Sequence, residues 1–192
     1  MRRDGGRVSP DLPDVISGRR LDLVLVSVRQ LLSRDGAHEP VPLGFADPHD
    51  VLHPDRSPLR FRIAQVREDP AVNPWLLRLA VLRTPDRTVV GLGNFHDRPD
   101  ARGMVEIGYR VLPAFRRQGF GREIALTLWG AAASHPQVRI LRASVSPDNE
   151  ASLSIIRGAG FVKVGEQDDP EDGLEWVFER TAVDGLAGVS RE

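Results

Sequence analysis

The chain has no cysteine, a single tyrosine and no long apolar run. The absence of cysteine excludes disulfides, thiolate metal sites and a cysteine nucleophile. No stretch approaches the roughly 18–20 consecutive apolar residues that a membrane-spanning helix needs. The arginines near the N-terminus are not followed by the apolar segment of a secretory signal. We therefore expect a cytoplasmic protein that does not contact a membrane.

The chain also lacks an excess of either charge, because 26 basic residues face 27 acidic ones and the net charge is −1. Without a global basic field, no nucleic-acid partner is expected. A length of 192 residues is enough for one domain with a substantial core. The polar composition at both ends predicts flexible tails over residues 1–18 and 181–192, with the folded domain at 19–180.

The stretch from 105 to 125 is predicted to run through a strand, a turn, a basic loop and a helix. Apolar residues at alternate positions from Val105 to Val111 are typical of a strand. Pro113 ends that strand, because proline cannot donate to a sheet ladder. A broad apolar stripe predicts a helix that begins at about Gly121.

The loop between this strand and this helix has the features of an anion site. The first N–H groups of a helix have no partner within the helix, and the helix dipole adds partial positive charge there. Gly119 and Gly121 allow close approach of a ligand to the backbone, and full charges come from Arg116, Arg117 and Arg122. A phosphate or pyrophosphate suits such a loop. A short G-x-G before a helix is, however, equally compatible with tight packing alone.

Three ordered motifs narrow this choice: EIGYRVLP at 106–113 followed by R-x-x-G-x-G, then N-E-A-S at 149–152, then G-F at 160–161. Together they cover roughly residues 88–161 and resemble the Rim-type branch of the GNAT N-acetyltransferase superfamily, which includes ribosomal-protein N-terminal acetyltransferases. The resemblance implies a single α/β domain with a mixed, mainly antiparallel central sheet flanked by helices. It also implies a splayed pair of parallel strands that holds acetyl-CoA, here 105–111 and 138–146.

The resemblance carries cofactor-binding roles to specific positions of this sequence, and it implies no metal. One departure is Arg117, which stands where the family often has glycine. The implied acetyl-CoA contacts are Val111, Leu112, Arg116, Arg117, Gln118, Gly119, Phe120, Gly121, Arg122, Asn149 and Ser152.

Acetyl transfer needs a neutral amine, and for a lysine-like amine at pH 7 the free form costs roughly 4–5 kcal/mol. Glu106 is the candidate general base, although a solvent-facing glutamate on a half-exposed strand is an equal alternative without the resemblance. Ser152 is the candidate proton donor to the departing thiolate, with helix-start hydrogen bonding as its alternative role. The N–H groups of Val111 and Leu112 are candidate oxyanion donors.

The proline-rich segment at 38–58 is a long irregular loop, and such loops are often functional. In the resembling family the segment between the first two strands shapes the acceptor pocket, so the resemblance implies that this loop shapes the choice of acceptor. His49 and His53 lie four residues apart in it, but a solvated loop is favoured over a metal site because neighbouring prolines prevent a long helix.

The sequence therefore predicts an acetyl-CoA-dependent N-acetyltransferase that acts on a primary amine by direct attack in a ternary complex. The amine acceptor could be a protein N-terminus or a small molecule, and a homodimer stays open. Two alternatives are a non-catalytic acyl-CoA-binding or regulatory domain of the same fold and a nucleotide-binding module.

Overall fold

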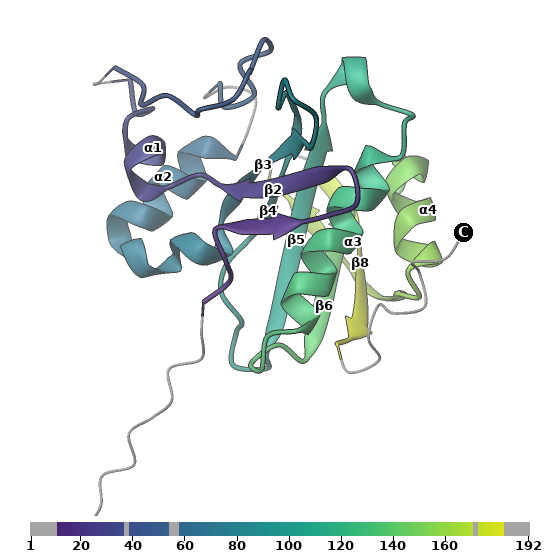
Figure 1. Ribbon diagram of the computed structural model, residues 1–192. Coiled ribbons are helices and arrows are strands. Elements are labelled where there is room, and N and C mark those ends of the chain that lie inside the picture. The colour runs from purple at the N-terminus through teal and green to yellow at the C-terminus, as the bar shows by residue number, and fades with distance from the viewer. Residues whose placement is uncertain (1–10, 37–38, 54–57, 171–172, 183–192) are drawn as a thin grey trace, which may run out of the picture.

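In the computed structural model, which describes residues 11–36, 39–53, 58–170 and 173–182, eight strands form one sheet in the order β1-β2-β3-β4-β5-β6-β8-β7 (Figure 1). Every neighbouring pair is antiparallel except β5 and β6, which run parallel. The predicted mixed, mainly antiparallel sheet is therefore confirmed. The strands are β1 (Val15–Ser17), β2 (Leu21–Leu25), β3 (Leu77–Leu82), β4 (Val89–Phe95), β5 (Met104–Val111), β6 (Ile140–Val145), β7 (Val162–Asp169) and β8 (Gly173–Thr181).

Helices cover both faces of this sheet, and side chains cap the N-termini of α1 and α4. Ser27 and Gln30 form a reciprocal capping box at α1, and the Asn149 side chain accepts from the Ser152 N–H at α4. Across the described residues, no helix is long and apolar enough to cross a membrane. The helices are α1 (Val28–Leu32), α2 (Leu59–Glu68), α3 (Phe120–Ala133) and α4 (Glu150–Gly158), with short 3₁₀ turns η1 (Pro70–Trp75) and η2 (Pro113–Phe115).

Two apolar clusters form the core, one on each face of the sheet. On one face, α1 and α2 pack over alternate residues of β3 such as Leu79 and Val81. The other face is covered by α3 (Figure 1). Its fully buried Leu128 and Trp129 belong to the same apolar cluster as Ile107 of β5. The alternation of side chains along each strand therefore decides which residues meet α2 and which meet α3.

The parallel pair separates soon after it forms. Pairing between β5 and β6 covers Met104 to Glu106 of β5 opposite Ile140 to Arg142 of β6. Beyond Glu106, β5 continues to Val111 with β4 as its paired neighbour, while β6 continues along β8. This separation produces a splay between β5 and β6, with the first turn of α3 and the first turn of α4 leading away from the two strands.

The prediction of a flexible tail over residues 1–18 is wrong for its second part. Leu12 and Ile16 are buried in the core, and β1 pairs with β2 because an apolar Ile16 lies opposite Leu23. The C-terminal boundary also moves, since Thr181 belongs to β8 and Ala182 is buried. Residues 1–10 and 183–192 lie outside the described part of the chain.

Two strand glycines provide a matched test of the sheet packing. Gly91 on β4 is buried, and a Cβ there would meet the backbone carbonyl of Arg110 on β5, whereas a Cβ at Gly165 on β7 would meet nothing within 4 Å. We expect Gly91→Ala to lower the free energy of unfolding by about 1–3 kcal/mol, because a backbone cannot move aside cheaply. Gly165→Ala should change it by less than about 1 kcal/mol. Urea denaturation measures both, and equal effects would contradict this packing.

Candidate active site

One of the two glycines in the basic loop, Gly119, has the positive φ that the sequence analysis predicts for it. Gly119 is the N-cap of α3, with φ of 80° and ψ of 3°, which is the left-handed region that favours glycine. Arg117 also has a positive φ, at 58°. This explains why glycine is common at the position of Arg117 in the resembling family. Residues 116–119 are exposed, so the loop is open to a ligand.

Gly121 has a different role from the one predicted, because it lies inside α3 and its φ is not positive. A Cβ on Gly121 would come within 3.3 Å of the Tyr109 ring and 3.8 Å of Ile155 on α4. The missing side chain therefore lets α3 approach β5 and α4 at the splay. The side chain of Phe120 is buried in the core, so only its backbone groups are candidates for contact with a ligand.

The backbone of β5 offers unpaired donors on the side of the splay. His96 N–H donates to Glu106 O at 2.9 Å and Leu112 N–H donates to Val90 O at 2.9 Å, so even-numbered residues of β5 bond β4. The groups of Tyr109 and Val111 then point the other way, toward the side of β6. Since β6 pairs with β5 no further than Glu106, those N–H groups face the splay.

This pattern corrects the prediction for Leu112. Its N–H is already bonded to β4, so it cannot serve as an oxyanion donor in this structure. Val111 keeps the candidate role. Its carbonyl accepts from Arg116 Nε at 3.2 Å, which ties the start of the basic loop to the end of β5.

Ser152 on α4 has a partner that the sequence analysis missed. Tyr109 Oη donates to Ser152 Oγ at 3.0 Å, and burial raises the pKa of the Tyr109 hydroxyl. The only tyrosine of the chain therefore reaches from β5 to the first turn of α4. No spacing in the sequence could show this contact, because the two residues are 43 positions apart.

Glu106 lies beside a histidine that the sequence analysis also missed. Its Oε2 is 3.9 Å from His96 Nδ1, and its side chain is 13% exposed while that of His96 is 48% exposed. Because Gly108 pairs with Asn94 across the antiparallel β4–β5 hairpin, counting two residues back along β5 and two residues forward along β4 places His96 opposite Glu106. The register of the predicted hairpin could therefore have indicated this contact from the sequence.

Two further elements surround His96. Arg62 Nη1 and Gln65 Nε2 of α2 donate to the His96 carbonyl at 2.8 and 3.0 Å. Partial desolvation lowers the pKa of His96, Glu106 raises it, Arg62 lowers it, and Asp169 of β7 raises it. With desolvation the largest of these effects, the imidazole is neutral at pH 7 and able to accept a proton.

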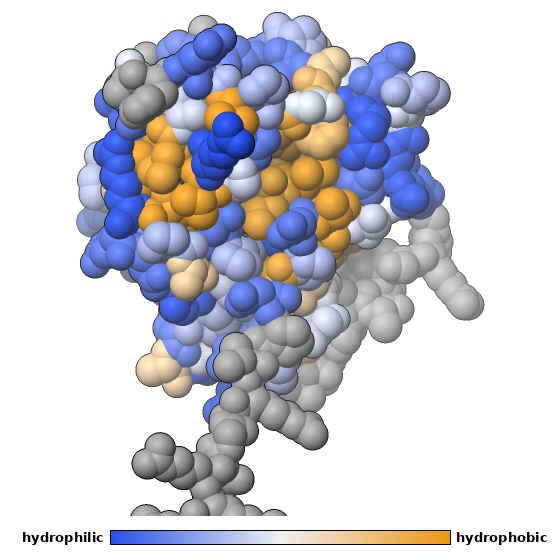
Figure 2. All heavy atoms as spheres, turned by 60° about the vertical axis from the view of Figure 1, so that its left-hand side comes forward, coloured by the Kyte–Doolittle hydropathy of each residue, from blue (hydrophilic) through white to orange (hydrophobic). Residues whose placement is uncertain are grey.

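A pocket of about 520 Å³ opens where α2, β4, β5 and the end of β7 meet. Asn94 is only 3% exposed and lines this pocket, and the absence of a Cβ at Gly108 leaves room for the Asn94 amide and the His96 ring. Figure 2 shows hydrophobic residues gathered on the side of α1 and α2, interrupted by hydrophilic ones. Other lining residues are Pro58, Phe61, Arg62, Tyr109 and Asp169.

Among the described residues of the proline-rich segment, Pro58 at its end is the one that lines this pocket. Of its two histidines, His49 lies edge-on to Phe115 at 6.2 Å. Within the described ranges, no group of three or more histidine, aspartate or glutamate residues could hold a metal ion. Residues 54–57, which belong to the same segment, lie outside the described part of the chain.

Residues 43–162 match the model of the acetyltransferase (GNAT) domain, and this segment is well over half of the 192 residues. The chain belongs to the GNAT acetyltransferase family. The family resemblance seen in the three sequence motifs is thereby confirmed, and the fold is the GNAT fold.

A curated relative of this GNAT protein is the uncharacterized N-acetyltransferase YoaA of Bacillus subtilis (strain 168), which is 29% identical over 89 residues. That match covers 46% of this chain and 50% of YoaA, so the chain spans about half the length of the curated relative. The whole relative therefore says little about the substrate of this protein.

Solved structures show the same fold over nearly the whole chain. RimJ of Mycobacterium smegmatis in complex with CoA-disulfide has a TM-score of 0.64 at 18% identity, covering 94% of this chain and 95% of RimJ. RimL, a ribosomal L7/L12 alpha-N-protein acetyltransferase in complex with coenzyme A, has a TM-score of 0.59 at 14% identity, covering 87% and 97%. At identities of 14–18%, the likeness to these neighbours is one of fold.

The lowered pKa of His96 in this GNAT protein predicts a specific dependence of stability on pH. As pH falls below about 6.5, the unfolded chain binds a proton at His96 before the folded protein does, so the wild type loses stability. His96→Gln cannot take that proton, and its stability relative to wild type should rise between about pH 7.5 and pH 5. Urea denaturation at both pH values measures the difference. An opposite trend would mean that Glu106 dominates and raises the pKa of His96.

Proposed function

We propose that this GNAT protein is an acetyl-CoA-dependent N-acetyltransferase that acetylates a primary amine by direct attack in a ternary complex. The observation that carries the proposal is the division of β5 into two faces. The side chain of Tyr109 packs on the face of the sheet that α3 covers, next to the basic loop. Gly108 and Glu106 lie on the opposite face, which α2 covers, where Gly108 lines the pocket and Glu106 lies beside His96. A thioester and an amine could therefore approach the same strand from opposite sides.

The residues present fit acetyl-CoA, which would supply the activated acetyl group. The exposed loop at 116–119, its positive φ at Arg117 and Gly119, and the first-turn N–H groups of α3 suit a pyrophosphate. Arg116, Arg117 and Arg122 add positive charge around it. Backbone groups of Val111 and the α4 start at Asn149 and Ser152 flank the splay, where a pantetheine amide needs hydrogen-bond partners.

The amine side of the site can remove a proton. Glu106 supplies a carboxylate, and the neutral His96 beside it lines the pocket in which we place the acceptor. Apo contacts between catalytic groups are often longer than in the working complex, so 3.9 Å is compatible with proton transfer through the pair. Both Glu106 and Asp169 also favour the approach of an ammonium group.

The thiol side of the site has a hydroxyl pair. Because Tyr109 donates to Ser152, the oxygen of Ser152 is already an acceptor and its own hydrogen can be donated elsewhere. We assign Ser152 as the proton donor to the departing thiolate and Tyr109 as the residue that orients it. Because a thiol has a pKa of about 8.5, the thiolate leaves readily without a proton, and we expect Ser152 to increase the rate only modestly.

A panel of amines tests the proposed function, with thiol release as the readout. The panel contains a short peptide with a free α-amine, the same peptide acetylated, a polyamine and single amino acids. Turnover of any member supports the enzyme, and a preference for the free peptide supports a protein N-terminus as acceptor. Acetyl-CoA binding without turnover of any amine would favour the alternative of a non-catalytic acyl-CoA-binding domain.

The cofactor loop is tested by Gly119→Val. Acetyl-CoA at a hundred times its Kd should stabilise the wild type by about 2.7 kcal/mol. Valine resists a positive φ, so most of this stabilisation should disappear in the variant. Gly36→Val is the matched control, because Gly36 also has a positive φ, 87°, but is exposed with open space around it. Thermal unfolding with and without acetyl-CoA measures the stabilisation of both variants. If folded Gly119→Val is stabilised by acetyl-CoA as much as the wild type, the loop does not bind the cosubstrate.

The base is tested by Glu106→Gln, which keeps the shape of the side chain but cannot take a proton. Turnover should fall by roughly 10²–10⁴-fold at pH 7, and the deficit should shrink as pH approaches the pKa of the amine, because solvent then supplies the neutral form. Acetyl-CoA affinity should stay within about twofold. Glu166→Gln on the exposed face of β7 is the control. A deficit that does not change with pH would assign Glu106 to positioning rather than proton transfer.

A further inference from the structure

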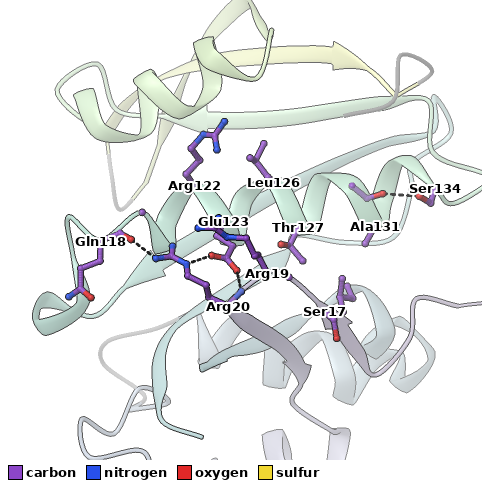
Figure 3. Close-up of a pocket in the computed structure, with 14 residues that line it drawn as sticks. Ser17, Arg19, Arg20, Gln118, Arg122, Glu123, Leu126, Thr127, Ala131 and Ser134 are labelled. Carbon is purple, nitrogen blue, oxygen red and sulfur yellow. Dashed lines mark hydrogen bonds and ion pairs between the residues drawn. The ribbon is translucent and has the colours of Figure 1, made fainter. Parts of the chain in front are cut away.

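Arg20 lies outside the motifs of the cofactor loop, yet it contacts that loop at several points. It belongs to the turn between β1 and β2, about a hundred residues before the loop in the sequence. Figure 3 shows its guanidinium between Gln118 and Glu123, at one end of a groove of about 770 Å³ along α3. The side chain of Arg20 also lies 4.4 Å above the ring of Phe120.

The side chain and the backbone N–H of Arg20 donate to the junction between the loop and α3, while the Arg20 carbonyl accepts from Arg83 N–H. Arg20 Nε donates to Glu123 Oε2 at 2.7 Å, and Nη1 donates to the Gln118 carbonyl at 2.9 Å. The Arg20 backbone N–H donates to Glu123 Oε1 at 2.5 Å. A Cβ at Gly119 would lie 3.3 Å from Arg20 Nη2. Arg20 thus contacts three of the six residues from 118 to 123, namely Gln118, Phe120 and Glu123.

The contact with Gln118 determines the direction of the next N–H group. In a trans peptide, the carbonyl and the following N–H point in opposite directions. Since Arg20 binds the carbonyl of Gln118, the N–H of Gly119 points away from Arg20 and out of the loop. This is one of the donors at the N-terminus of α3 that an anionic ligand would need.

The contact with Glu123 removes an unfavourable charge. Glu123 is the acidic residue in the first turn of α3, where a carboxylate would repel a bound phosphate. Burial raises the pKa of Glu123, but hydrogen bonds from Arg20 and from the Leu21 N–H outweigh burial and lower it overall. Glu123 is therefore ionised, 12% exposed and directed toward the β1–β2 turn rather than toward the loop.

We infer that Arg20 is a positioning residue for phosphate binding: it holds the Gln118 carbonyl and the Glu123 carboxylate so that the loop presents its N–H groups to the pyrophosphate of the cosubstrate. The inference rests on the proposed function, because it needs a ligand that carries phosphates. A residue that only stabilises the fold would affect the binding of every ligand. A positioning role for phosphate binding instead predicts that Arg20 leaves the affinity for the pantetheine part of the ligand unchanged.

The test compares two ligands, coenzyme A and phosphate-free pantetheine, with Kd measured by titration. In Arg20→Ala we expect the Kd for coenzyme A to rise at least tenfold while that for pantetheine changes by less than about twofold. Arg19→Ala is the matched control. Arg19 is exposed and lines the same groove, and its side chain makes no hydrogen bond or ion pair within the described residues. Equal losses for both ligands, or equal effects of the two variants, would overturn the inference.

Two further variants separate positioning from charge and from folding. In Arg20→Ala combined with Glu123→Gln the unpaired carboxylate is gone, and we expect coenzyme A to stay weakly bound because Gln118 is still unsupported. If the Kd for coenzyme A returned to the wild-type value, the role of Arg20 would be to neutralise Glu123 alone, and the inference would be overturned. Should Arg20→Ala fail to fold, Arg20→Lys keeps the charge but cannot bond both partners, and wild-type affinity in it would also overturn the inference.

The same experiment distinguishes this inference from the proposed function. Wild-type protein that does not bind coenzyme A would overturn both. Wild-type binding with an unchanged Kd in Arg20→Ala would overturn the role of Arg20 alone and leave the proposed acetyltransferase in place.

Discussion

The separation of β5 from β6 after Glu106 is the constraint on which the site depends. A strand in the middle of a sheet normally bonds both neighbours, and unpaired backbone groups away from water cost free energy. From Ile107 to Val111, β5 bonds β4 on one side, while β6 has already turned to pair with β8. The groups on the open side are thus available to a ligand. The helices α3 and α4, which lead away from the two strands, hold them apart.

The same strand divides the charges of the site. Its α3 face leads to arginines and unpaired N–H groups, which suit an anion. Its α2 face has Glu106 with His96 and Asp169 nearby, which suit a cation. Glu123 lies in the first turn of α3 on the anion-binding side, and Arg20 binds it away from the loop. We therefore propose that an anionic cosubstrate and an amine acceptor approach opposite faces of β5.

Contiguous features of the site could be predicted from the sequence, and features made by distant segments could not. The loop was predictable because its glycine, its arginines and the helix start are neighbours in the chain. His96 was within reach, since hairpin pairing places it opposite Glu106. Ser152 was predicted without Tyr109, because only folding brings β5 to α4. The error at Leu112 arose because the alternation of N–H directions depends on how β4 pairs with β5.

The sequence by itself determined the family, the strand, loop and helix between residues 105 and 125, and the charge of the basic loop, because periodicity and glycine positions act over a few residues. The tertiary structure alone decided that β1 completes the sheet, that the Leu112 N–H is bonded to β4, and which residues support the site. Arg20 and Glu123 meet across 103 positions, and such a contact depends on how a whole sheet and helix pack. Long-range packing has no local signature in one sequence, which is why these supporting residues appeared only in the folded chain.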